Sequence, residues 1–190
     1  FSSYNATLAD ATIGTTSTMS NALPGSYALN VTQLATAQKR SSDAYDKSAA
    51  IGSGTLTIGV GTASLDVSVS ATDTLSDIAN NINRASNNPG VSATVVYGAS
   101  GAQLLLSSSK TGVANGFSIS AGSGSSAGLG TLATKLGTAG SSEAQDAQLT
   151  LDNIAITSAS NSVSGAIDGV TLNLAATGST ALTVTEDTSV

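Results

Sequence analysis

The chain has 190 residues, enough for one large domain or two small ones, and 40% of them are hydrophobic. Only 9% are charged, against roughly 25% in an ordinary domain, so serine, threonine, asparagine and glycine must keep the surface soluble. Twelve acidic residues outnumber six basic ones and give a net charge of −6. Without a basic stripe, this balance argues against nucleic-acid binding, which requires clustered cations.

Membrane insertion and cysteine chemistry are not expected either. No apolar run approaches the roughly 20 residues of a membrane-spanning helix. The chain has no cysteine, which excludes disulfides and thiolate metal sites. It begins at Phe1 without a methionine, and we therefore interpret it as a piece of a longer protein.

The first clear element in chain order is a strand that begins near residue 25. Residues 6–21 before it are rich in Ala, Thr and Ser and are weakly patterned. Pro24 and Gly25 predict a turn, in which proline fixes φ and glycine supplies a positive φ. The strand that follows places alternate apolar residues on one face: Tyr27, Leu29 and Val31. Residues 38–48 hold three of the six basic residues and predict a solvated connector.

A hairpin and a helix are predicted next. Residues 54–60 and 64–70 alternate apolar and small polar side chains and are joined by a short link at 61–63, which indicates a β-hairpin. The segment TLSDIANNIN then spaces its apolar residues as one face of a helix: Leu75, Ile78, Ala79 and Ile82. Thr74 and Asp77 predict a capping box at its start, and the NNPG sequence at 87–90 should end it.

Strands resume after the helix and continue to the end of the chain. Three are predicted at 91–97, 102–108 and 116–120, whereas the Gly/Ser-rich residues 121–142 predict a loose loop with one helical turn. A second series of strands and turns starts at Glu143 and resembles the first weakly. Asp168 and Gly169 predict a turn within it. We expect Tyr27, Tyr97 and Phe117 to lie in hydrophobic cores because of their places in the strand pattern.

These elements predict a mainly β fold with a few short helices, of the α+β class, in two small β-rich domains. Residues 49–139 would form one domain, inserted into a discontinuous domain made of residues 1–48 and 140–190. The predicted helix would cover one face of the inserted domain's sheet.

The sequence offers no catalytic constellation. It has no histidine and no cysteine, so the usual nucleophile–base arrangements are excluded. SSSKTG at 107–112 matches two motifs of penicillin-binding enzymes, but both would need the same Lys110. GSGSSA at 122–127 lacks the flanking elements of a dinucleotide site. The aspartates lack calcium-loop spacing. We therefore predict no enzyme activity, no cofactor and no metal site.

Three segments together carry a resemblance to a known family. ALPGSYALNVTQLATAQK, from Ala22 to Lys39, resembles the start of the head of bacterial flagellar filament cap proteins, the hook-associated protein 2 family. DTLSDIANNIN resembles the hook IN motif, named for the pair that is Ile82 and Asn83 here. AQDAQLTLDNIAITSASNSVSGAIDGVTLNL resembles a third segment of the family, with Asn153 where the family usually has glycine; asparagine also tolerates positive φ.

The resemblance implies the function as well as the fold. Cap proteins of this family form a ring at the filament tip through helical legs, retain exported flagellin, and promote its folding and insertion. The expected partners are thus further copies of the full-length protein and flagellin, the location is the extracellular filament tip, and in some bacteria host mucins or glycans are bound. The alternatives are the outer domains of another axial protein, a flagellin or junction protein, or a surface adhesin. The structural motif residues implied are Leu75, Ile78, Ala79, Ile82, Asn83, Pro24, Gly25, Tyr27 and Gly169.

Overall fold

The buried apolar side chains form two separate hydrophobic clusters, a first cluster among residues 51–136 and a second among residues 13–35 and 147–184. The computed structural model describes residues 2–188. Unit 1 contains residues 1–36 and 145–190, and unit 2 contains residues 37–144. The fold is mainly β with two short α-helices, which confirms the predicted class.

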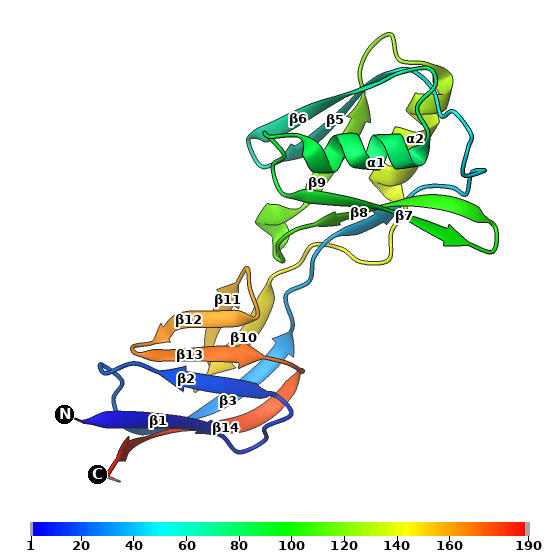
Figure 1. The fold of residues 1–190 in the computed structure, drawn as a ribbon. Coiled ribbons are helices and arrows are strands. Elements are labelled where there is room, and N and C mark those ends of the chain that lie inside the picture. Colours follow the sequence, from blue (N-terminus) through cyan, green and yellow to red (C-terminus); the bar gives the residue numbers. More distant parts are fainter. Residues whose placement is uncertain (1, 189–190) are drawn as a thin grey trace. The chain divides into compact units, whose positions relative to one another are not determined.

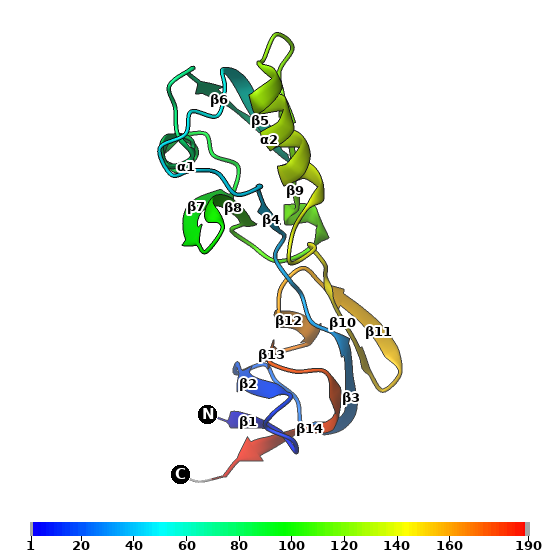
Figure 2. The same cartoon turned by 90° about the vertical axis from the view of Figure 1, so that its right-hand side faces the viewer.

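Unit 1 is a sandwich of two antiparallel sheets around the second cluster (Figures 1 and 2). Its five-stranded sheet has the order β1-β14-β3-β10-β11, and its three-stranded sheet has the order β12-β13-β2. The apolar faces of alternating strands meet between the sheets. The strands are β1 Ser3–Leu8, β2 Gly14–Thr18, β3 Gly25–Gln33, β10 Ala147–Leu151, β11 Ile154–Ser158, β12 Ser162–Ile167, β13 Val170–Leu174 and β14 Gly178–Asp187.

Unit 2 encloses the first cluster between two three-stranded sheets and two helices. The sheet orders are β4-β8-β7 and β6-β5-β9. Helix α1 packs against β7 and β8, and helix α2 packs against β9 and β4. The elements are β4 Lys39–Ser41, β5 Gly54–Val60, β6 Ala63–Val69, α1 Leu75–Arg84, β7 Val91–Gly98, β8 Gly101–Ser108, the 3-10 turn η1 Val113–Asn115, β9 Phe117–Ala121 and α2 Ala127–Thr138.

The structure moves both predicted boundaries of the insert. Residues 38–48, predicted as a solvated connector of the outer domain, belong to unit 2 together with Ala37, because β4 pairs with β8 and Tyr45 forms a bridge with Ala102. Arg40 and Ser42 are buried there. At the other boundary, residues 140–144 also belong to unit 2, since the Lys39 amide donates to the Ser142 carbonyl.

The predicted loop at 121–142 is wrong for most of its length. Residues 127–138 form α2, which buries Leu129, Leu132, Ala133 and Leu136. Ser126 caps it by accepting a hydrogen bond from the Leu129 amide. The helical spacing and the capping serine were present in the sequence, but the high glycine and serine content obscured them.

Three smaller predictions also differ from the structure. Residues 6–21 include the second half of β1 and all of β2 rather than unpatterned chain. Tyr97 is 64% exposed because β7 and β8 extend beyond the core at their hairpin end. Gly25 is the first residue of β3 and not the positive-φ residue of a turn.

Candidate functional site: the IN-motif helix and its asparagines

Helix α1 begins at a complete capping box. The Thr74 side chain accepts a hydrogen bond from the Asp77 amide, and the Asp77 carboxylate accepts one from the Thr74 amide, at 3.4 and 2.9 Å. Both bonds satisfy amides that the first helical turn leaves without partners. They also hold the pKa of Asp77 below its ordinary value, first through the bond from the Thr74 backbone. Arg84 lies in the last turn, where a cation complements the helix dipole.

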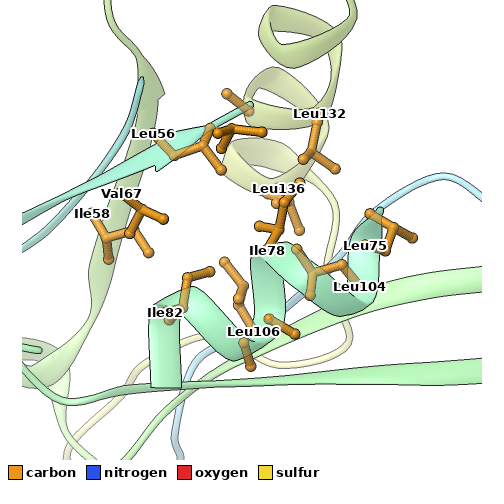
Figure 3. Packing of buried hydrophobic residues seen from close by; sticks show 14 of the residues in the cluster. Leu56, Ile58, Val67, Leu75, Ile78, Ile82, Leu104, Leu106, Leu132 and Leu136 are labelled. Atoms are coloured by element: carbon orange, nitrogen blue, oxygen red, sulfur yellow. The ribbon is translucent and has the colours of Figure 1, made fainter. Parts of the chain in front are cut away.

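One face of α1 is buried as the sequence predicted. Ile78 and Ile82 are fully buried, and Leu75 and Ala79 are nearly so. Figure 3 shows Leu75, Ile78 and Ile82 pointing into a cluster that also contains side chains of both sheets and of α2, among them Leu56, Leu104 and Leu132. The helix therefore closes the core of unit 2, and its apolar motif residues are structural.

The asparagines that surround the end of α1 have two different roles. Asn80 and Asn81 are exposed on the polar face. The Asn83 amide group instead pairs with Ala93 of β7, donating to its carbonyl at 2.7 Å and accepting from its amide at 2.8 Å. Asn88 donates to the Ile82 and Val91 carbonyls and accepts from the Gly90 and Val91 amides. These side chains thus attach the end of the helix to the start of β7.

Asn83→Ala should lower the free energy of unfolding by about 1–3 kcal/mol, because the substitution leaves the partly buried backbone groups of Ala93 without partners. Asn80→Ala, on the exposed face of the same helix, should change it by less than about 0.5 kcal/mol. Urea unfolding followed by circular dichroism measures both. Equal effects of the two substitutions would show that the pairing with Ala93 contributes nothing.

The four remaining motif residues lie in unit 1 and do not form one cluster with the helix residues. Pro24 is exposed, and Gly25 leaves room for the Tyr27 ring: a Cβ on Gly25 would lie 2.7 Å from the Tyr27 hydroxyl. Gly169 has a φ of 74°, so the predicted turn with Asp168 is confirmed. A Cβ there would lie 2.5 Å from the Ala22 amide nitrogen, which explains the requirement for glycine.

The two chain segments that lead into and out of unit 2 are joined to each other in a clasp, residues 37–41 and 139–143. The Lys39 amide donates to the Ser142 carbonyl, and the Ser41 amide donates to the Ala139 carbonyl. The buried Arg40 guanidinium donates both Nη atoms to the Glu143 carboxylate at 2.8 and 2.9 Å. Because the ends of unit 2 are held together in this way, it can be inserted between two strands of another fold.

The ion pair of the clasp makes stability depend on acid pH. Hydrogen bonds from Arg40 lower the pKa of Glu143 below its ordinary value of 4.5. A carboxyl with a lower pKa in the folded state contributes stability above its unfolded pKa and loses it as the pH falls through its folded pKa. Glu143→Gln should therefore reduce the loss of stability between about pH 6 and pH 3 in urea titrations. Asp168→Asn, which removes a carboxyl from unit 1, is the control and should leave the contribution of the clasp intact.

Two polar side chains that sequence reasoning missed also hold unit 2 together. Gln38 donates to the carbonyl of Phe117 and accepts from its amide. Ser42 accepts from the Leu104 amide at 2.8 Å. Both residues are buried. In the sequence, only the nearness of Gln38 and Ser42 to apolar strands suggested that they are buried. The three basic residues of the same segment suggested instead that it is exposed to solvent.

The described residues 2–188 contain no group of three or more acidic side chains arranged to hold a metal ion. Within the same residues, no helix has the length and apolar character to cross a membrane.

Comparison with known proteins agrees with this architecture. Residues 55–110 match the family described as the flagellin hook IN motif, and residues 144–190 match the family described as the flagellar hook-associated protein 2 C-terminus. The D2–D3 domains of the flagellar cap protein FliD from Escherichia coli superpose with a TM-score of 0.84 at 34% identity, over 98% of this chain and 100% of that one. The chain belongs to the FliD family of flagellar cap proteins.

Two further relatives show how much of a FliD protein the chain represents. The crystal structure of FliD from Pseudomonas aeruginosa matches with a TM-score of 0.78 at 34% identity, over 92% of this chain and 85% of that one. The curated B-type flagellar hook-associated protein 2 of the same species is 32% identical over 173 residues, which are 82% of this chain and 36% of the relative. The chain thus spans about a third of that full-length protein.

Proposed function

We propose that this chain is the head of a flagellar filament cap, which holds exported flagellin at the filament tip and promotes its folding and polymerisation. The observation that carries the proposal is the match over both units to the D2–D3 domains of a flagellar cap protein. The relatives are structural flagellar proteins, and no enzyme activity is proposed. The place of action would be the extracellular tip of the filament.

A domain exchange tests this proposal. The chain would replace the D2–D3 domains of the Escherichia coli cap protein, with the rest of that protein unchanged. We expect swimming motility to be restored in a strain without its own cap protein and less flagellin to be lost to the medium. A chimera that folds and is exported but leaves flagellin loss unchanged would contradict the proposal.

Self-association is proposed for the full-length protein rather than for this chain alone. Among the described residues, few large apolar side chains are exposed, three in each unit, and the adjacent pair Val96 and Tyr97 face opposite sides of one strand. Stable interfaces usually bury at least about 1,000 Å² around apolar anchors. Light scattering at micromolar concentration should therefore show a monomer. A closed oligomer of the chain alone would place the ring interface here.

We also propose that the two units are independent folding domains, because each has its own hydrophobic cluster. Scanning calorimetry should resolve two unfolding transitions. A core substitution in one unit should shift the transition of that unit and leave the other unchanged.

Binding to mucins or other glycans stays a prediction of the family resemblance, and a glycan array tests it.

A further inference from the structure

The outer strand β11 leaves one edge of the larger sheet in unit 1 open (Figure 2). It pairs with β10 on one side and is the last strand in the sheet order. A two-residue turn, Asp152 and Asn153 with φ of 47° and 67°, connects the two strands. In such a hairpin the two residues that flank the turn form both backbone hydrogen bonds with each other, and so does every second pair after them. The backbone amides and carbonyls of the residues in between point away from the partner strand. Ala155 and Thr157 therefore direct their amides and carbonyls to the open edge.

The other sheet edges of unit 1 are protected. Strands β1 and β2 lie against each other, and the hydroxyls of Thr16 and Thr18 donate to the carbonyls of Ala6 and Tyr4. Strand β12 has a register shift around Gly165, whose φ is 80°, and such a bulge interrupts pairing. Strand β11 reads IAITS, without charge, proline or glycine, and Ile154 is 68% exposed. It has none of the features that usually prevent strand addition.

The charge of the chain is divided unevenly between the units. Unit 1 contains six acidic residues and no lysine or arginine: Asp10, Asp146, Asp152, Asp168, Glu186 and Asp187. The other six acidic residues and all six basic residues lie in unit 2, which therefore accounts for none of the net charge of −6. Asp152 lies in the turn that precedes β11, but its carboxylate accepts a hydrogen bond from the Ala28 amide of β3, on the opposite side of β10 from the open edge.

The uneven charge indicates which kind of strand would pair with the open edge of β11. A second copy of unit 1 would add another six carboxylates and no cation to the pair, so repulsion between like charges would oppose its binding. A cationic strand would gain the backbone hydrogen bonds of Ala155 and Thr157 and would be attracted by the net negative charge of unit 1. We propose that the β11 edge binds an extended segment of a partner protein that carries lysine or arginine, by strand addition.

The probe is a nine-residue peptide of alternating threonine and valine with a lysine at each end, added to the 190-residue chain. We expect it to slow hydrogen exchange of the Ala155 and Thr157 amides, measured by NMR. A peptide with glutamate in place of both lysines should bind about tenfold more weakly, because the net negative charge of unit 1 would repel it. Thr157→Pro, tolerated where the amide faces outward, should abolish protection at residue 155. Thr157→Val, which keeps the amide, should bind as the unchanged chain does.

If Thr157→Pro does not fold, a second variant that keeps all backbone amides can still test the proposal. Ile154→Lys changes an exposed side chain and should weaken binding of the lysine peptide through repulsion. The proposal is overturned if the peptide protects neither amide at millimolar concentration, or if both peptides bind equally. Protection that appears without peptide and grows with protein concentration would also overturn it, because the occupant would then be a second copy.

Discussion

Replacing Ile78 by alanine should lower the free energy of unfolding of unit 2 by about 2–5 kcal/mol, from lost burial and from the cavity that remains. The Ile78 side chain is fully buried at the centre of the inner face of α1. Figure 3 shows it directed toward the region of Leu132 and Leu136 of α2. Because both helices and both sheets contribute to this cluster, the space cannot be filled by a small movement of one element.

Scanning calorimetry distinguishes this loss from a general effect of mutation. The transition of unit 2 should move to lower temperature, whereas that of unit 1, which has a separate cluster, should not. Ala79→Gly is not a suitable control because it also alters helix propensity. Asn81→Ala, on the exposed face of α1, is a suitable control and should change the free energy of unfolding of either unit by less than about 0.5 kcal/mol. An unchanged unit 2 transition in Ile78→Ala would mean that the core does not depend on this face.

Two glycines of α2 should respond in opposite directions to the same substitution. A Cβ on Gly128 would clash with the backbone carbonyl oxygen of Ile51, which passes close to the start of the helix. A Cβ on Gly130 would meet no atom within 4 Å. Gly128→Ala should therefore destabilise unit 2 by about 1–3 kcal/mol, because backbone must move to admit the methyl group. Gly130→Ala should stabilise it by about 0.5–1 kcal/mol, because alanine loses less conformational freedom in a helix.

The contact at Gly128 is held in place by hydrogen bonds at the helix start. The Ser53 amide donates to the Ser126 hydroxyl at 2.9 Å, and the Ser126 amide donates to the Ser53 carbonyl at 2.7 Å. The segment that carries Ile51 therefore cannot move away freely. Chemical denaturation of both glycine variants measures the difference. If Gly128→Ala were as stable as Gly130→Ala, the approach of Ile51 to the helix would be looser than the structure shows.

Some parts of the molecule were predictable because their signals lie within a few residues of each other. The apolar period and the capping box of Thr74 and Asp77 specify α1 locally. The hairpin of β5 and β6 follows from two alternating runs joined at Gly61 and Thr62. Gly169 was identified as a turn residue because few residue types accept positive φ, and the family resemblance placed Asn153 where such a residue is needed. In each case a short-range steric or hydrogen-bonding rule is sufficient.

Only the tertiary structure decided the features that depend on residues far apart in the chain. The domain boundary moved because β4 pairs with β8, and the same pairing buries Arg40, whose charge had suggested a solvated segment. Helix α2 packs mainly against β9, and its apolar side chains join the hydrophobic cluster of unit 2. Tyr97 continues an apolar face of β7 but is exposed, because local alternation does not reveal where the core ends. The open edge of β11 likewise exists because, among the strands of residues 2–188, β11 pairs with β10 alone. Periodicity tells which side of an element is apolar, whereas long-range pairing determines what covers that side.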